Sequence, residues 1–516
     1  MRFVIRSMRV PFVLLAIALL SDCARAQDPP PAQGNSSPSV QSLERRVQEL
    51  EQTIRRMQTA GPGVVTVSQT LPPAPMAGTV QPQPQPTAGD QLPPPTPSTD
   101  NIVSPIDGDG DIRRPPVVAG WDNGFFLRST DRAFYLRITG QIQADYRTFL
   151  DDVDSVDVDT FFLRRARLGI EADLLQYYEF RFLPDFGQGQ AVIQDSYINV
   201  HYWDLFQVEA GKFKQPFSYE QLIQDRYVPT LERSLIDQLV PARDVGVMIH
   251  GQKLIGNRFD YAASVSNGEI NGNGDTNDRK DVVARAVVRP LNSDWIWPIL
   301  QGWQFGISAS TGIEEEPASP STLKTPAGVP WFQFNPTVRA NGLRNRWSPE
   351  ISYFYGSLGM AAQYFTMDQK FSPTFVGPGS NTVENVPFDG FYFLATYLLT
   401  GEERTAYSQQ IRPIHDFNPC CPFACGGAWE LVTRVSRLEL GDVVFAPPPA
   451  RLADPTRSAR GATELTLGFN WYLNAWVRTQ FNWEHAWFDD PVRLGAGPGG
   501  LLNHQDTLMT RFQIIF

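Results

Sequence analysis

Basic side chains recur at every second position in segments whose other positions are apolar. Arg165 and Arg167 alternate with Ala166, Leu168 and Ile170. This period of two is that of a β-strand, in which alternate side chains point to opposite faces. Arginine keeps its charge and offers several donors to a phosphate or carboxylate, so arginines on one face of a sheet can guide anions. The candidate anion-binding residues are Arg165, Arg167, Lys212, Lys214, Arg226, Arg233, Arg243, Arg434 and Arg478.

Catalytic and metal-binding motifs give no competing signal. The five histidines show no metal-ligand spacing, and no GxSxG or Walker sequence occurs. We therefore expect no enzyme activity, no metal and no cofactor, although a barrel hydrolase with catalytic groups on scattered loops remains an alternative. Residues 107–111 lack the terminal Glu of a calcium loop. In an exported protein, Cys420, Cys421 and Cys425 favour one disulfide and a leftover thiol over a metal site.

The last 56 residues show the strand pattern most clearly. Leu465 and Leu467 alternate with Glu464 and Thr466, the next segment repeats the pattern, and Phe516 belongs to the apolar face of the last one. In a soluble sandwich this apolar face would point into a core. Aromatic residues at both strand ends instead favour a membrane barrel, in which aromatic girdles mark the two interfaces.

Sixteen segments are compatible with strands, and their connections alternate in length. Short turns on one side and long loops on the other are typical of an outer-membrane barrel, whereas a sandwich has no reason to sort its loops. The predicted fold is all-β, a 16-stranded antiparallel transmembrane β-barrel. Two connections, 290–301 and 400–426, are long where short turns are expected. The segments are 133–149, 160–174, 176–184, 190–202, 205–213, 244–254, 258–267, 281–289, 302–312, 346–356, 358–369, 388–399, 427–440, 461–472, 475–487 and 505–516.

The N-terminal region predicts three further segments. Residues 1–26 have the charged start, apolar middle and Ala-Arg-Ala end of a signal peptide, so the protein is exported. No other run approaches the ~20 apolar residues that a spanning helix needs. Residues 38–58 carry a heptad pattern that predicts a short coiled coil or, alternatively, a lone amphipathic helix. Residues 59–116 are rich in Pro, Gln and Gly and predict a disordered linker before a barrel domain at 117–516.

The third long loop, residues 214–243, is unusually apolar for an exposed connection. It should therefore pack against something, either inside the barrel lumen or at a subunit interface.

The charge balance of the predicted barrel domain is less favourable for the passage of anions. Residues 1–116 contain ten residues of each sign, so the rest of the chain contains 34 Lys and Arg against 45 Asp and Glu. Acidic loops at an entrance would repel anions.

Several ordered stretches resemble the phosphate-selective porin O and P family of Gram-negative outer membranes. The resemblance implies a sixteen-stranded trimeric porin whose third loop folds inward and whose basic side chains guide anions. We therefore expect passive diffusion of small anionic or polar solutes such as phosphate, with outer-membrane lipid around the barrel and no nucleic acid as partner. The alternative is a structural tether, in which the periplasmic coiled coil and linker join the barrel to the cell wall. The stretches are FFLRRARLG at 161–169, GKFKQPF at 211–217, LERS at 231–234, RDVG at 243–246, GAWEL at 427–431 and GFNWY at 468–472.

Overall fold

The computed structural model describes residues 117–150, 158–268, 275, 277–315, 317–318, 320–373, 383–420, 426–493 and 501–516. The predicted signal peptide, coiled coil and linker lie outside these residues, as do Cys421 and Cys425. Within them, no helix combines the length and the apolar character that crossing a membrane would require.

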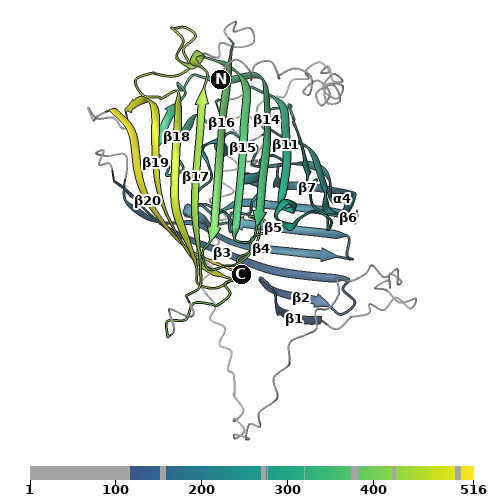
Figure 1. The fold of residues 1–516 in the computed structure, drawn as a ribbon. Helices are drawn as coiled ribbons and strands as arrows, with labels where there is room; N and C mark the ends of the chain where they lie inside the picture. Colours follow the sequence, from purple (N-terminus) through teal and green to yellow (C-terminus); the bar gives the residue numbers. More distant parts are fainter. Residues whose placement is uncertain are drawn as a thin grey trace, which may run out of the picture. The chain divides into compact units, whose positions relative to one another are not determined.

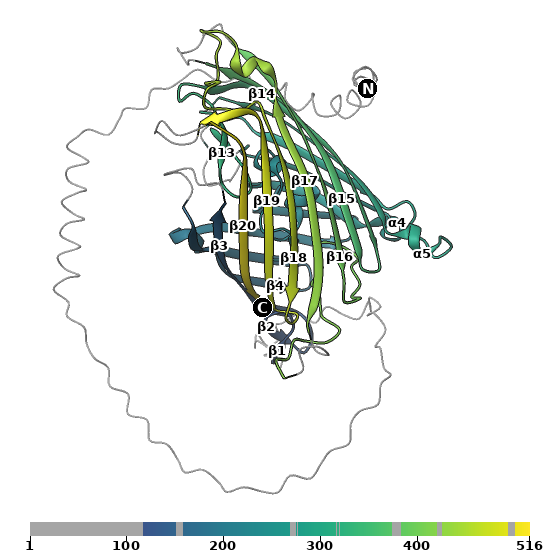
Figure 2. The same ribbon diagram turned by 60° about the vertical axis from the view of Figure 1, so that its left-hand side comes forward.

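Sixteen antiparallel strands form a closed barrel, which confirms the predicted fold (Figure 1). Each barrel strand pairs with the next, and the last, β20, pairs with the first barrel strand, β3, which closes the ring of sixteen strands. Figure 2 shows β20 beside β3. All sixteen predicted segments are strands, and the largest difference is at β14, which begins at Arg339 rather than at residue 346. The strands are β3 (Phe134–Phe149), β4 (Thr160–Leu174), β5 (Tyr178–Asp185), β6 (Val192–Trp203), β7 (Phe206–Lys214), β8 (Arg243–Lys253), β9 (Phe259–Ser266), β10 (Asp281–Val288), β11 (Trp303–Glu314), β14 (Arg339–Tyr355), β15 (Leu358–Ser372), β16 (Glu384–Leu398), β17 (Ala428–Leu440), β18 (Gly461–Tyr472), β19 (Val477–Arg493) and β20 (Leu501–Ile515).

A hairpin of β1 (Val117–Trp121) and β2 (Phe125–Ser129) precedes the barrel and was not predicted. β2 pairs with the first half of β3, while β20 pairs with the second half. The changeover occurs at Gly140, whose backbone exchanges hydrogen bonds of 2.7 and 2.9 Å with Phe516. The hairpin therefore continues the wall where β20 ends.

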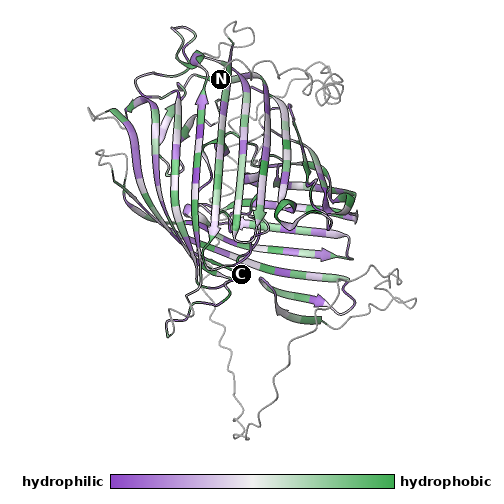
Figure 3. Ribbon diagram, in the orientation of Figure 1, coloured by the Kyte–Doolittle hydropathy of each residue, from purple (hydrophilic) through white to green (hydrophobic). Residues whose placement is uncertain are grey.

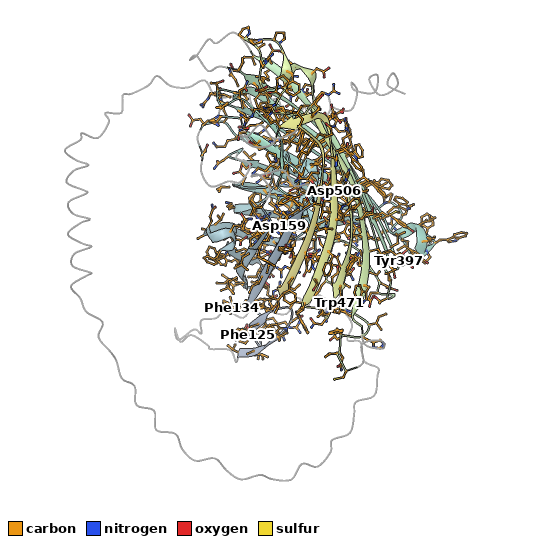
Figure 4. All side chains as sticks on the ribbon, turned by 90° about the vertical axis from the view of Figure 1, so that its left-hand side faces the viewer. Phe125, Phe134, Asp159, Tyr397, Trp471 and Asp506 are labelled. Atoms are coloured by element: carbon orange, nitrogen blue, oxygen red, sulfur yellow. The ribbon has the colours of Figure 1, made fainter. Side chains whose placement is uncertain are left out.

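The strands place apolar side chains outside and polar side chains inside. Leu467 and Phe512 are exposed, whereas Glu464 and Gln480 are completely buried from solvent. Figure 3 shows the corresponding alternation of hydrophobic and hydrophilic residues along the strands. Figure 4 shows Phe134 and Trp471 at one end of the barrel, with Asp159 and Asp506 toward the other. An apolar exterior around a polar lumen is the arrangement of a membrane barrel and excludes the sandwich alternative.

The third loop, residues 215–242 between β7 and β8, folds into the lumen. It contains a helical turn, α3 (Tyr219–Leu222), and a 3-10 turn, η3 (Leu235–Gln238). Phe217, Leu235 and Ile236 are buried against the inner wall of β15–β17. The fit is close, because a Cβ added at Gly390 of β16 would lie 2.5 Å from Ile236. Burial of its apolar side chains explains why this loop does not project into water.

Two other loops extend the same apolar cluster. The β11–β14 connection forms a small hairpin of β12 (Thr322–Lys324) and β13 (Pro330–Gln333), and the β17–β18 connection contains η4 (Asp442–Phe445). Trp331, Phe332 and Val444 are buried in one cluster with the third loop and the inner face of β14–β18. The β14–β18 side of the lumen is therefore packed with protein.

The described part of the β16–β17 connection that follows β16, residues 399–420, also turns inward, from the end of the barrel opposite to the third loop. The Arg404 guanidinium donates to Glu430 Oε1 of β17 at 2.6 Å. Tyr407 is completely buried and packs edge-on against Phe354 of β14, with ring centroids 5.1 Å apart. Its ring centroid also lies 6.4 Å from that of Tyr219 in the third loop. Through this ring pair, the connection contacts the third loop.

Candidate solute pathway

The open space in the lumen lies along β3–β8, away from the packed side. A cavity of about 230 Å³ lies between these strands and the third loop. Five basic and three acidic side chains line it, so its lining is positive although the barrel domain as a whole is acidic. The charged lining residues are Arg167, Arg181, Lys214, Arg226, Arg243, Asp195, Glu209 and Asp225.

A second cavity, of about 320 Å³, lies nearer the short turns. It is lined from the same wall, by residues of β3–β7. Arg137 and Glu171, two of its charged residues, form an ion pair. The two cavities mark a polar route on one side of the barrel, from the third loop toward the turn end.

A β-bulge in β4 brings an additional arginine into the lumen. The pairing of β3 with β4 slips between Gln143 and Ala144, so that Arg164 has no direct partner residue on β3. Arg164 donates to the Glu232 carboxylate of the third loop at 2.7 and 3.1 Å. The next residue, Arg165, donates to Gln143 at 2.7 Å. Both side chains can face inward only because the bulge interrupts the strict alternation of the strand.

Asp225 of the third loop is the acidic centre of the constriction. Its carboxylate pairs with Arg167 of the wall, lies 2.7 Å from Arg233 and 3.7 Å from Arg165, and reaches within 4.0 Å of Arg243. Burial alone would raise the pKa of Asp225, but the guanidiniums of Arg165, Arg233 and Arg167 hold it well below its usual range. Asp225 is therefore ionised and fixes the loop against the basic wall.

Arg434 and Arg478 join the opposite wall to the third loop. Arg434 is fully buried and donates to Glu464 Oε1 of β18 at 2.9 Å and to the Glu232 carbonyl at 2.6 Å. Arg478 donates to the Val228 carbonyl at 3.2 Å. These two arginines therefore attach the third loop to the wall at β17 and β19.

The nine arginines and lysines proposed from the sequence thus occupy distinct positions. Four line the 230 Å³ cavity: Arg167, Lys214, Arg226 and Arg243. Arg165, Arg434 and Arg478 contact the third loop from the wall, and Arg233 pairs within that loop. Lys212 is buried in β7. Lys214 donates to the carbonyls of Gln221 and Ile223, at 2.6 and 2.8 Å.

Sequence reasoning missed the arginines on β3 and β5. Arg181 lines the 230 Å³ cavity and pairs with Glu171 at 3.0 Å and Asp195 at 3.2 Å. Its position between the apolar Phe180 and Phe182 is the same alternation that identified Arg165 and Arg167. The sequence did not indicate the acidic residues of the third loop that pair with these wall arginines. Such pairs join segments that are far apart in the chain, so no local pattern predicts them.

The part of the chain that the structure describes contains neither a candidate metal site nor a disulfide. No group of three or more His, Cys, Asp or Glu there could hold a metal ion. Cys420 is free and exposed. The pairing predicted for the cysteine cluster involves residues outside the described part and stays a prediction.

A closed barrel with an apolar exterior, a loop folded into its lumen and a charged inner route defines an outer-membrane porin. The chain belongs to the family "phosphate-selective porin O and P", whose model matches residues 136–491. Its curated relatives include Porin O of Pseudomonas aeruginosa, which is 20% identical over 430 residues, covering 78% of this chain and 92% of that protein. The family identifies the molecule as a channel of the outer membrane.

Solved structures show weaker similarity. An anion-selective porin from Comamonas acidovorans aligns with 11% identity and a TM-score of 0.46, covering 74% of this chain and all of that one. OmpT, an outer-membrane protein of Vibrio cholerae, aligns with 9% identity and a TM-score of 0.44, covering 74% of this chain and 98% of that one.

Proposed function

We propose that this porin allows small hydrophilic solutes to diffuse passively across the outer membrane and prefers anions, phosphate among them, to cations. The observation that carries the proposal is the lining of the 230 Å³ cavity, where five basic side chains face three acidic ones. Fixed positive charges at the narrow part of a pore attract anions and repel cations. The description of the family as phosphate-selective supports the same preference.

Planar-bilayer recording tests this proposal. With the purified protein in a KCl gradient, the reversal potential should have the sign of an anion-preferring pore, and added phosphate should reduce the chloride current. Arg226→Gln should move the reversal potential toward cations, because Arg226 lines the cavity. Arg457→Gln, which removes an exposed charge outside the cavity, is the control and should change nothing. A cation-selective wild-type pore would contradict the anion preference.

We also infer that the barrel assembles as a homotrimer through its short wall. The strands β5, β9 and β10 each have eight residues, whereas β14 and β19 have 17. A strand rises about 3.4 Å per residue, so eight residues span about 27 Å along the strand axis. With a tilt of about 40° they cross only about 20 Å, less than the ~25 Å apolar band of a barrel. Burial against neighbouring subunits would cover this wall where lipid fits it poorly.

A further inference from the structure

Glu209 and Arg226 line the 230 Å³ cavity, and neither side chain has an oppositely charged partner among the described residues. Glu209 of β7 lines the cavity and is 8% exposed, yet among the described residues its carboxylate accepts no hydrogen bond and forms no ion pair. Arg226 of the third loop lines the same cavity, and its guanidinium likewise contacts no described carboxylate. Its one ring contact is with the neighbouring Tyr227, whose centroid lies 5.7 Å away.

The other charged side chains of this cavity already have partners, and Lys214 donates to the backbone carbonyls of Gln221 and Ile223. Arg243 donates to Asp195 at 2.6 Å, and Arg181 lies 3.2 Å from the same carboxylate. Arg167 is paired with Asp225 and also donates to Asp185 at 2.7 Å. A solute entering the cavity therefore meets one unpaired carboxyl group on the wall, that of Glu209, and one guanidinium on the loop, that of Arg226, with no described carboxylate in contact with it.

A buried, unpaired charge is costly, and a solute that supplies the opposite charge removes that cost. Burial lowers the pKa of Arg226, the positive charges of Arg181 and Arg137 act in the same direction, and Tyr227 and Glu171 offset part of the change. An anionic group beside Arg226 is therefore favoured. An ammonium group is favoured beside Glu209 for the corresponding reason. A simple anion satisfies only the first of the two.

The net charge of the whole barrel domain also favours a zwitterion over a simple anion. This part of the chain contains 34 basic and 45 acidic residues, and its acidic surroundings repel an anion before it reaches the constriction. A solute with no net charge avoids this repulsion. The cavity, at about 230 Å³, also has room for a small organic solute together with water.

We propose that the cavity is a binding site for small zwitterions, with Arg226 contacting the carboxylate and Glu209 the ammonium group. This inference rests on the proposed function, because it names the solute class that the same pore passes best.

Four solutes of nearly equal size distinguish the effect of a solute's carboxylate from the effect of its ammonium group. Alanine carries both, lactate only the carboxylate, alaninamide only the ammonium, and lactamide neither. Their entry rates into liposomes containing the full-length protein would be measured by osmotic swelling at pH 7. Alanine should enter faster than lactate, at rates normalised to lactamide. Glu209→Gln should slow alanine and alaninamide by about threefold and leave lactate no slower, a factor expected for a partly solvated charge pair.

Arg226→Gln should slow alanine and lactate and spare alaninamide. The matched control is Glu439→Gln, because Glu439 is an exposed side chain on the outer face of β17. An unchanged lactamide rate shows that each variant is folded and open. If Glu209→Gln leaves the ratio of alanine to lactate unchanged, the zwitterion site is wrong and the pore is a simple anion channel. If lactamide itself does not enter, the proposed pore function fails instead.

Discussion

Arg511 of the last strand and Asp145 of the first barrel strand form two hydrogen bonds, both of 2.7 Å, across the seam that closes the barrel. Both side chains are almost fully buried, with exposed fractions of 1% and 4%. Arg511 also donates to the Leu231 carbonyl at 2.5 Å and lies 3.0 Å from Glu232. One guanidinium therefore fixes the third loop to the seam.

Arg511→Ala should destabilise both the seam and the loop. Removing one partner of a buried ion pair leaves the other charge uncompensated, at a cost of about 3–5 kcal/mol. The measurement is the urea midpoint in detergent, together with current noise in bilayers, which should increase as the loop loosens. Arg437→Ala is the control. Its pair with Asp489 is partly exposed and should contribute no more than about 1 kcal/mol. Equal effects of the two variants would contradict the role assigned to Arg511.

Asp225→Asn should strengthen anion preference while loosening the third loop. The change removes the negative charge that Arg165, Arg167 and Arg233 share, and their positive charges then face the pathway unopposed. The reversal potential in a KCl gradient should move further toward anions. Asp389→Asn, on the outer face of β16 where it accepts from Tyr364, should leave it unchanged. A shift toward cations would show that Asp225 does not set the field of the constriction.

The third loop should also carry a pH dependence. Burial raises the pKa of Asp237 to about 7, repulsion from Glu220 adds to the rise, and the Arg233 guanidinium offsets part of it. The folded state therefore retains this proton after the unfolded state has lost it. Stability from Asp237 is fully present below about pH 4, the ordinary pKa of Asp, and declines as the pH rises toward the folded value of about 7.

Asp237→Asn should remove this part of the decline. Urea midpoints of the wild type and the variant, measured from pH 4 to pH 8, should converge at the acid end and separate in favour of the variant at the alkaline end. A variant that loses as much stability as the wild type over this range would show that Asp237 does not cause the change.

The short wall gives a prediction about assembly. Val247 of β8, the strand that pairs with β9 of the short wall, is 51% exposed on the outer face, so Val247→Lys should separate the subunits. Native mass measurement in mild detergent should give three chains for the wild type and one for the variant. Leu467→Lys, on the exposed outer face of β18 and away from the short wall, places a charge against lipid instead and should leave the trimer intact. A wild-type protein that is monomeric would end the trimer proposal.

The orientation of the wall residues could be predicted from the sequence, because a strand has a strict period of two. This period placed Arg165 and Arg167 inside and Leu168 outside, as the structure shows. It failed at Arg164, where the bulge adds one residue to β4 and no local pattern indicates the slip. The short β1–β2 hairpin was missed because its five-residue strands show too few alternations.

The inward folding of the third loop was also predictable, since a loop so apolar must be buried somewhere. Its partners were not. Arg434 meets Glu220 across 214 residues of chain, and such ion pairs depend on how the barrel closes rather than on nearby sequence. For the same reason the long connection at 399–427 had no explanation until Arg404 was seen to reach Glu430.

The most direct test of the account is single-channel recording of the purified protein and of a chain in which a short Gly-Ser linker replaces residues 217–240 of the third loop. The account predicts stepwise, ion-conducting openings for the wild type and a larger, less ion-selective conductance for the truncated chain, because this loop forms the constriction. No stepwise conductance in a folded wild-type barrel would contradict the channel. An unchanged conductance after truncation would show that the constriction lies elsewhere.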